Sequence, residues 1–305
     1  MSFLQSNETL VLTGVTAGFG EKALHQILGN ARCPVIIGVT NPDRVRPEIA
    51  QKVTVLPLDL ASFRSVAAFC DDVKERGTVG GLVLNAGISA RKLRDTADGI
   101  NLTFQTNYLS HFAMVQALWT TLSNEAHIVV TSSGTHDPDE KTPPPPPRHA
   151  NAAMLARPKT DPRLDRSGQK AASRAYTSSK LCCTMLSLEL AARREKGTSI
   201  SFDPGLVPGT SLTREFPAWL VKLLVPIMSR TMPADRTSTL PVSAVALAQF
   251  MAQTSFVGTN GDYVAMRGGY PIVVNPSDMA RDADLRAVLW RDSEQLLVDN
   301  PAWPS

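Results

Sequence analysis

The sequence predicts an α/β fold in which one doubly wound, mainly parallel sheet is covered by helices on both faces. Short apolar segments alternate with segments of helical spacing along the 305 residues. The first apolar segment leads directly into a glycine-rich turn. Short buried strands separated by helices are typical of parallel βαβ units. The length fits one α/β domain, so we expect residues 1–305 to form a single domain.

The expected elements follow one another in a regular order. We expect strands at Thr9–Thr13, Pro34–Val39, Val53–Pro57, Gly81–Leu84, His127–Thr131, Thr198–Phe202 and Gly261–Val264. Apolar residues at helical spacing predict helices at Glu21–Leu28, Ser62–Glu75, Gly99–Leu122 and Tyr176–Arg194. One long segment, 134–175, has no place in this alternation.

Residues 134–175 are expected to form a surface insertion. The segment contains five consecutive prolines, Pro143–Pro147. Such a run is excluded from helix interiors and central strands, so polyproline II or irregular loop is expected. An SH3-type ligand is the less favoured interpretation. The segment has a surplus of Lys and Arg that accounts for the whole net charge of +3, which indicates a solvated surface. His136 and His149 are expected to be surface residues without a role.

Composition narrows the function classes. The small net charge gives no argument for nucleic acid or an anionic membrane. The four cysteines, Cys33, Cys70, Cys182 and Cys183, have no metal-ligand spacing and suit a reducing compartment. The apolar stretch Trp219–Met228 is too short to span a bilayer, and residues 1–9 lack a secretory signal. We therefore expect a cytoplasmic protein that acts on a small molecule, without a metal.

The turn after the first strand has the composition of a phosphate-binding loop. It reads Thr13-Gly14-Val15-Thr16-Ala17-Gly18-Phe19-Gly20 and opens the first helix. Glycines there let the backbone approach a pyrophosphate, which rests on the helix N-terminus. The spacing is G-x-x-x-G-x-G instead of the commoner G-x-G-x-x-G. The loop predicts a dinucleotide site formed by Gly14, Thr16, Gly18, Phe19 and Gly20.

A second motif places a phenol and an ammonium on one helical face. Tyr176 and Lys180 are separated by four positions in a predicted helix. A phenol has a pKa of about 10, too high for efficient proton transfer near neutrality. A neighbouring ammonium stabilises the phenolate and lowers that pKa. Taken alone, the motif also fits an exposed amphipathic helix.

These two motifs, in this order, resemble the short-chain dehydrogenases/reductases, whose fold is the Rossmann-type sheet already expected. The resemblance implies that Tyr176 is the general acid–base and that Lys180 also contacts the nicotinamide ribose. It assigns Ser133, at the end of a strand, to the substrate oxygen, with Ser132 as the competing assignment. Asn107 would hold a water that links Lys180 to solvent; otherwise it is a helix-interior amide.

The same resemblance implies further cofactor contacts. Asp59-Leu60 would lie at the adenine ring and Asn85-Ala86-Gly87 at the adenosine ribose, although Asp and Asn also cap loops without binding anything. The stretch from Asp203 to Thr210 resembles the segment beside the nicotinamide. Its expected cofactor contacts are Pro204, Gly205, Val207 and Thr210.

The choice between NAD and NADP depends on the end of the second strand. An NAD enzyme usually places a carboxylate there to hold the ribose 2′-hydroxyl. Here the strand ends in Val39-Thr40-Asn41. Thr40 and Asn41 could donate hydrogen bonds to a 2′-phosphate, with charge from Arg44 or Arg46. We therefore favour NADP(H) over NAD(H), with Asp43 as the group that would serve NAD.

Two stretches, Tyr176–Cys182 and Asp203–Thr210, narrow the resemblance to the retinol-dehydrogenase and protochlorophyllide-reductase branch, which acts on bulky apolar substrates. Residues 206–232 would form a substrate lid, or else core packing. The expected activity is that of an NADP(H)-dependent ketoreductase or alcohol dehydrogenase. The alternatives are a C=C reductase and a non-catalytic NADP(H)-sensing regulator. The insertion could cover the face through which many relatives form homodimers, so monomer and homodimer both stay open.

Overall fold

The computed structural model describes residues 7–205, 238–252 and 259–303. Its strands form one sheet in the order β3-β2-β1-β4-β5-β6-β7-β8. All neighbouring strands are parallel except β7 and β8. The bounds are Thr9–Thr13 (β1), Val35–Val39 (β2), Thr54–Pro57 (β3), Val79–Leu84 (β4), Leu122–Thr131 (β5), Thr198–Asp203 (β6), Tyr263–Arg267 (β7) and Tyr270–Val274 (β8). The predicted α/β sheet is confirmed, with an antiparallel edge strand β8 that was not expected.

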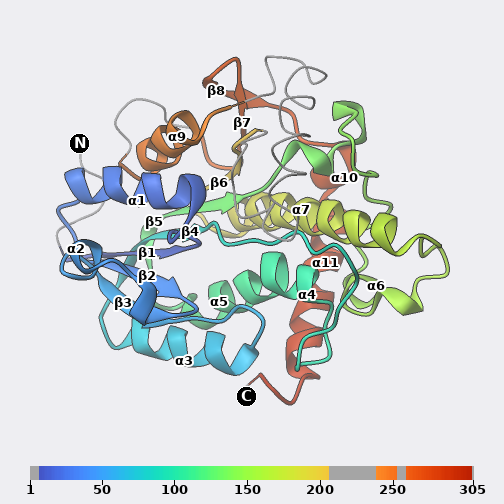
Figure 1. Cartoon of the computed structure of the whole chain (residues 1–305), viewed down its shortest axis with the longest axis horizontal. Coiled ribbons are helices and arrows are strands. Elements are labelled where there is room, and N and C mark those ends of the chain that lie inside the picture. Colours follow the sequence, from blue (N-terminus) through green and yellow to red (C-terminus); the bar gives the residue numbers. More distant parts are fainter. Residues whose placement is uncertain (1–6, 206–237, 253–258, 304–305) are drawn as a thin grey trace.

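Helices cover both faces of the sheet (Figure 1). One face carries α1 (Gly18–Asn30) and α9 (Leu240–Ala252), which share a hydrophobic core with β1 and β2. The other carries α3 (Phe63–Lys74), α5 (Ser110–Leu118), α7 (Gly168–Arg193) and α11 (Ala283–Val298). Strands β1, β2 and β4 are buried along their whole length, as expected of central parallel strands.

Two predicted helices have different bounds in the structure. The helix expected at 99–122 comprises α4 (Leu102–Phe104), a π-helical segment (Gln105–Leu109) and α5, and Leu122 already belongs to β5. The helix expected from Tyr176 begins at Gly168 because Ser167 accepts a hydrogen bond from the Lys170 amide and caps it. The predicted insertion 134–175 therefore includes the first turns of α7.

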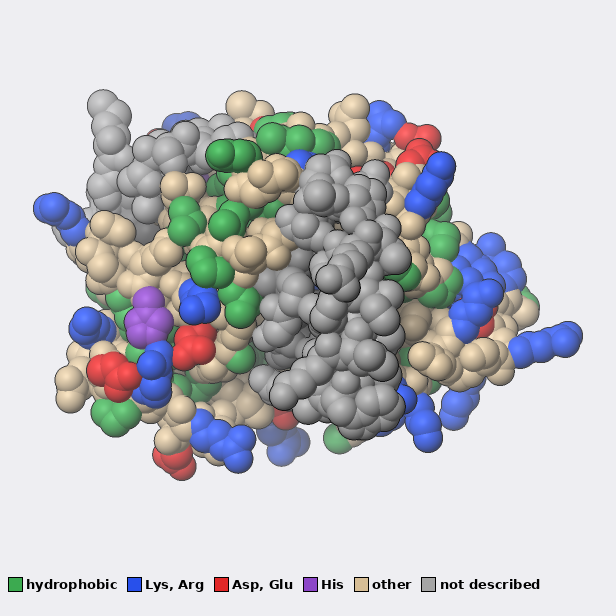
Figure 2. All heavy atoms as spheres, turned by 45° about the horizontal axis from the view of Figure 1, so that its top comes forward, with side chains coloured by type: hydrophobic (Ala, Val, Ile, Leu, Met, Phe, Trp, Pro, Cys, Tyr) green, Lys and Arg blue, Asp and Glu red, His purple; other side chains and the backbone are tan. Residues whose placement is uncertain are grey.

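The insertion is only partly a solvated loop, which corrects the sequence interpretation. It contains a short helix, α6 (Ala152–Ala156), and Ala152, Leu155 and Ala156 are buried in the core beneath the sheet. Its exposed side chains include the cations Arg157, Lys159, Arg163, Arg166 and Lys170. Figure 2 shows Lys and Arg side chains gathered at the end of the molecule that α6 and the start of α7 occupy in Figure 1.

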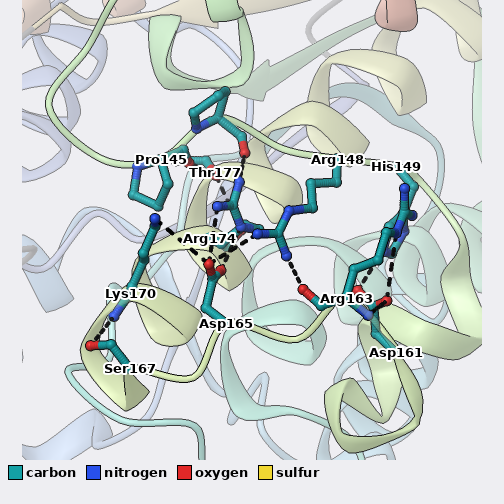
Figure 3. Close-up of polar contacts among 11 residues, drawn as sticks. Pro145, Arg148, His149, Asp161, Arg163, Asp165, Ser167, Lys170, Arg174 and Thr177 are labelled. Carbon is teal, nitrogen blue, oxygen red and sulfur yellow. Dashed lines mark hydrogen bonds and ion pairs between the residues drawn. The ribbon is translucent and has the colours of Figure 1, made fainter.

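One buried carboxylate, that of Asp165, attaches this segment to α7 (Figure 3). Asp165 accepts from Arg174 Nε at 2.6 Å and from Arg148 Nη2 at 3.0 Å, and its side chain is only 6% exposed. Arg174 also donates to the Pro146 carbonyl, and the Thr177 hydroxyl donates to the Pro145 carbonyl at 2.8 Å. Prolines lack N–H groups but keep strong acceptors. The proline run is thus held against the turn of α7 that carries Tyr176.

The outer helix α11 packs on the helices that carry Asn107 and Tyr176. Phe112 meets Trp290 edge to face at 4.9 Å, and the Tyr108 hydroxyl bonds the Ser293 hydroxyl at 2.8 Å. Helix α6 also contacts α11 and α7. On this surface, which the sequence suggested the insertion could cover, α11 therefore packs, with α6 of the insertion beside it. Within the described parts of the chain, no helix is long and apolar enough to cross a bilayer.

Candidate active site

Several strands end at one edge of the sheet, and the predicted site residues follow them. β1 ends at Thr13, β4 at Leu84, β5 at Thr131 and β6 at Asp203. The direction of chain connection reverses between β1 and β4 in the strand order. Doubly wound sheets bind ligands beside such a switch point, outside the carboxyl ends of the strands.

The glycine loop leaves no room for side chains. A Cβ on Gly14 would lie 2.6 Å from the Ala86 backbone, and one on Gly20 would lie 2.3 Å from the Gly14 carbonyl oxygen. Gly14 and Gly18 also have φ of +67° and +64°, the left-handed region that favours glycine. The three glycines are therefore required by the path of the loop itself.

Helix α1 starts without a side-chain cap. Its N-cap residue is Ala17, whereas α3, α7 and α11 are capped by Ser62, Ser167 and Asp282. Uncapped amide N–H groups and the positive end of the helix dipole make a natural anion site. The residues present therefore fit the pyrophosphate of a dinucleotide, with Thr16 exposed beside them. Phe19 packs edge to face on Phe202 at 6.5 Å.

Asn85 braces the glycine loop. Its Nδ2 donates to the Gly14 carbonyl at 2.8 Å, and its Oδ1 accepts from the Thr131 hydroxyl at 3.0 Å. The Thr13 hydroxyl accepts from the amides of Asn85 and Ala86 at 3.0 and 3.1 Å. Both ends of the Asn85 amide are therefore engaged within the protein, and its contribution to a cofactor site is to hold the loop in shape.

The 2′-site candidates differ in availability. Thr40 and Asn41 are exposed after β2, but Asn41 Oδ1 already accepts from the Asp43 amide at 3.1 Å. Arg46 is held by Glu21 at 2.9 Å and Glu48 at 3.3 Å. Arg44 has no ion-pair partner among the described residues. Of the two predicted cations, Arg44 is the one available to a ligand.

Other expected cofactor contacts lie at the same edge. One Asp59 oxygen caps the turn by accepting from the Ala61 amide at 2.9 Å, and Leu60 is buried. The turn after β6 is fixed because the Gly205 amide donates to Asp203 Oδ1 at 2.9 Å and Ser243 donates to the Pro204 carbonyl at 2.9 Å. Val207, Thr210 and the expected lid at 206–232 lie outside the described residues.

The side chains of the two serines after β5 point in different directions. Ser132 Oγ is buried against α7, where it bonds the Lys180 carbonyl at 3.0 Å and the Thr184 hydroxyl at 2.6 Å. Ser133 instead lies on the side of Tyr176, where its hydroxyl lowers the pKa of the phenol. Successive side chains of an extended segment point to opposite sides, so only one serine can face the Tyr176 phenol.

Asn107 and Lys180 meet beside Gly87. A Cβ on Gly87 would lie 3.3 Å from Asn107 Oδ1 and 3.6 Å from Lys180 Nζ. The Asn107 amide exchanges hydrogen bonds with the Ile88 backbone at 2.8 and 3.0 Å, and Nδ2 also donates to Ser179 Oγ at 2.9 Å. Lys180 Nζ donates to the Thr131 carbonyl at 2.9 Å and lies 5.9 Å from the Tyr176 ring centre.

Burial governs protonation here, which corrects one sequence expectation. It raises the pKa of Tyr176 well above its ordinary value; the Ser133 hydroxyl opposes this increase, and the Asp203 charge adds to it. Burial also lowers the pKa of Lys180. The expected lowering of the phenol pKa by the ammonium is not seen. The protein alone therefore keeps Tyr176 as a neutral phenol.

Sequence reasoning missed a partly buried ionic cluster next to this site. Arg267, at the end of β7, donates to Glu140 at 2.7 Å and to Asp203 at 3.4 Å. Asp203 is buried beside the loop after β5, since a Cβ on Gly134 would lie 3.1 Å from its Oδ2. The cluster joins three segments that are far apart in sequence, and no local pattern indicates it.

His136 was expected on the surface and is buried. Its Nδ1 donates to the Ser133 carbonyl at 2.8 Å, its Nε2 accepts from the Ser277 amide at 3.2 Å, and its ring packs on Tyr263. His149 is half-buried and bonds Asp161 Oδ2 through Nε2 at 3.1 Å, instead of being a free surface residue. Both corrections arise from partners brought in by the tertiary fold.

Comparison with known proteins identifies the class. A family model described as short chain dehydrogenase matches residues 8–140. The WW domain-containing oxidoreductase of Gallus gallus is 30% identical over 96% of this chain, which covers 68% of that protein. The chloroplastic protochlorophyllide reductase of Chlamydomonas reinhardtii is 30% identical over 69% of this chain and 58% of its own length. A solved structure from Mycobacterium paratuberculosis has a TM-score of 0.68 and 26% identity, covering 97% of this chain and 94% of its own.

The fold, the loop and these relatives define an oxidoreductase of the kind that binds a nicotinamide cofactor. The chain belongs to the short-chain dehydrogenase family, in the branch that includes protochlorophyllide reductases. It spans about two thirds of the length of the WW domain-containing relative.

Proposed function

We propose that this protein is an NADP(H)-dependent oxidoreductase that transfers hydride between nicotinamide and the carbonyl or alcohol of a bulky apolar substrate, with Tyr176 as the general acid–base. The observation that carries the proposal is the assembly of Asn107, Ser133, Tyr176 and Lys180 at the sheet edge that also holds the glycine loop. A regulator that only binds the cofactor would not need any of these four side chains for proton transfer, so their presence together favours an enzyme.

The chain's own residues account for the proton side of the reaction. The bound nicotinamide would supply or accept the hydride. Ser133 would hold the substrate oxygen next to the Tyr176 phenol, where charge develops. In the protein alone burial keeps that phenol protonated, so Tyr176 carries the proton that carbonyl reduction would require. Lys180 and Asn107 lie together behind it, where a relay to solvent would begin.

NADP(H) preference is part of the proposal. It is supported by the lack of a carboxylate directly after β2 and by the availability of Arg44. A C=C reductase is the second candidate, because one relative is a protochlorophyllide reductase. Product analysis distinguishes the two.

The experiment titrates purified protein with NADPH and NADH, followed by nicotinamide fluorescence, and then adds a carbonyl panel. We expect tighter binding of NADPH. Arg44→Ala should weaken NADPH binding about tenfold or more, the scale of one charged hydrogen bond, and leave NADH unchanged. Arg46→Ala is the matched control, because that guanidinium is held by Glu21 and Glu48. Equal binding of both nucleotides would refute the NADP assignment.

A further inference from the structure

The carbonyl of Asn107 is held by a buried histidine. Asn107 lies in the π-helical segment between α4 and α5. Such segments displace backbone groups from the ordinary helical ladder and often occur at functional sites. The Asn107 carbonyl accepts from His111 Nδ1 at 3.0 Å and from Cys183 Sγ at 3.2 Å. Its side-chain amide is separately fixed by Ile88 and Ser179.

The partners of His111 define its tautomer. A carbonyl only accepts, so Nδ1 carries the proton. Burial lowers the pKa of His111 to about 4, so the ring is neutral near neutral pH and Nε2 is an acceptor. The Thr13 hydroxyl lies 3.1 Å from Nε2 and 3.2 Å from the Val83 carbonyl, so its one proton is shared between these two acceptors. The lone pairs of the Thr13 hydroxyl accept hydrogen bonds from the amides of Asn85 and Ala86.

We propose that His111 is a positioning residue for the reaction: its Nδ1–H holds the Asn107 carbonyl, so that Asn107 keeps its place beside Lys180 in the proton relay. This inference rests on the proposed function. His111 is fully buried and touches no reacting atom. Its two nitrogens join the helix that carries Asn107 to the end of β1, where the glycine loop begins.

The two bonds are not equivalent. If the Nε2 bond is lost, the Thr13 hydroxyl has an alternative acceptor in the Val83 carbonyl at 3.2 Å, and its lone pairs stay on the two amides. If the Nδ1 bond is lost, the Cys183 thiol, a weak donor, is the one side chain among the described residues that still bonds the Asn107 carbonyl. The bond to Asn107 is therefore the one on which turnover depends.

Two substitutions separate these bonds. His111→Asn keeps a donor where Nδ1 stands, and His111→Gln keeps an acceptor where Nε2 stands. We expect His111→Gln to lower kcat about tenfold, the scale of one buried hydrogen bond, and to increase the solvent deuterium isotope effect on kcat. Its NADPH dissociation constant should change less than about threefold. His111→Asn should keep kcat within about threefold of wild type.

His127→Gln is the matched control. His127 is also a buried histidine with a threonine partner, Thr198, but it lies in β5 away from the site. The His127→Gln variant should be less stable than wild type, but its kcat, counted per molecule that binds NADPH, should be unchanged. If His111→Gln behaves like this control, the inference is wrong. If wild type does not oxidise NADPH with any substrate, or Tyr176→Phe is fully active, the proposed function fails and the inference falls with it.

Discussion

Replacing Gly20 by Ala tests the packing of the cofactor loop. The new Cβ would lie 2.3 Å from the Gly14 carbonyl oxygen and 2.8 Å from Asn85 Nδ2. The first contact is with backbone, so the start of α1 must move. Helix propensity alone favours Ala over Gly by about 1 kcal/mol. Overpacking costs about 1–3 kcal/mol and strained hydrogen bonds add to it, so we expect a net loss of about 2 kcal/mol.

Gly29 provides the comparison. It lies in the same helix, is exposed, and a Cβ there would meet nothing within 4 Å. Gly29→Ala should therefore be neutral or stabilise by up to about 1 kcal/mol. By thermal unfolding, Gly20→Ala should melt about 4–8 °C below wild type. Its affinity for NADPH should fall about tenfold or more, since the amides at the start of α1 are displaced. Equal melting temperatures and equal NADPH affinity for the two variants would refute the described packing.

Three further predictions concern charge. Asp165→Asn should destabilise the protein by about 1–3 kcal/mol in chemical unfolding at pH 7. The bond from Arg174 keeps the pKa of Asp165 below its ordinary value, so the stability that the carboxylate contributes is present above that value and is lost as pH falls. The free energy of unfolding of the variant should therefore depend less on pH in acid than that of wild type. If the free energy of unfolding of the variant falls in acid as steeply as that of wild type, this role of Asp165 is contradicted. Burial lowers the pKa values of His111 and His127 to about 4, so the unfolded chain takes up the proton first and stability should fall from about pH 6.5 towards pH 4, with a smaller fall in His127→Gln. A pH-independent free energy of unfolding across that window would contradict the burial of both rings. Asp203→Asn should move the pH–rate profile lower by about one pH unit or less, because the Asp203 charge raises the pKa of Tyr176. Glu140→Gln is the control, because Glu140 is also bonded to Arg267. A profile that moves in the control and not in Asp203→Asn would contradict the effect assigned to Asp203.

What the sequence could predict was mostly local. Burial on both faces makes central strands such as β1 and β4 apolar throughout, and the G-x-x-x-G-x-G loop is dictated by contacts within a few residues of Gly14 and by the close approach of Ala86. The Tyr-x-x-x-Lys pair was visible because four positions define one helical face. Each of these signals lies within a short window of sequence.

What the sequence could not predict depends on distant partners. His136 has an unremarkable sequence context, and its burial depends on Ser277 and Tyr263. The Asp203–Arg267–Glu140 cluster joins residues 64 and 127 positions apart. The expected effect of Lys180 on Tyr176 considered the charge alone and left out burial, which acts in the opposite direction. Assignment of a role to His111 likewise required the contact with Thr13, 98 positions away.

The most direct test of the central claim is the turnover of Tyr176→Phe compared with its NADPH affinity. Phe keeps the ring and its packing but has no proton to exchange. With a carbonyl substrate that wild type reduces, we expect the variant to bind NADPH as wild type does, within about twofold. Its turnover should fall at least about a hundredfold, the lower range for the loss of a general acid. Turnover near the wild-type rate, with NADPH still bound, would contradict the assignment of Tyr176 and of the site built around it.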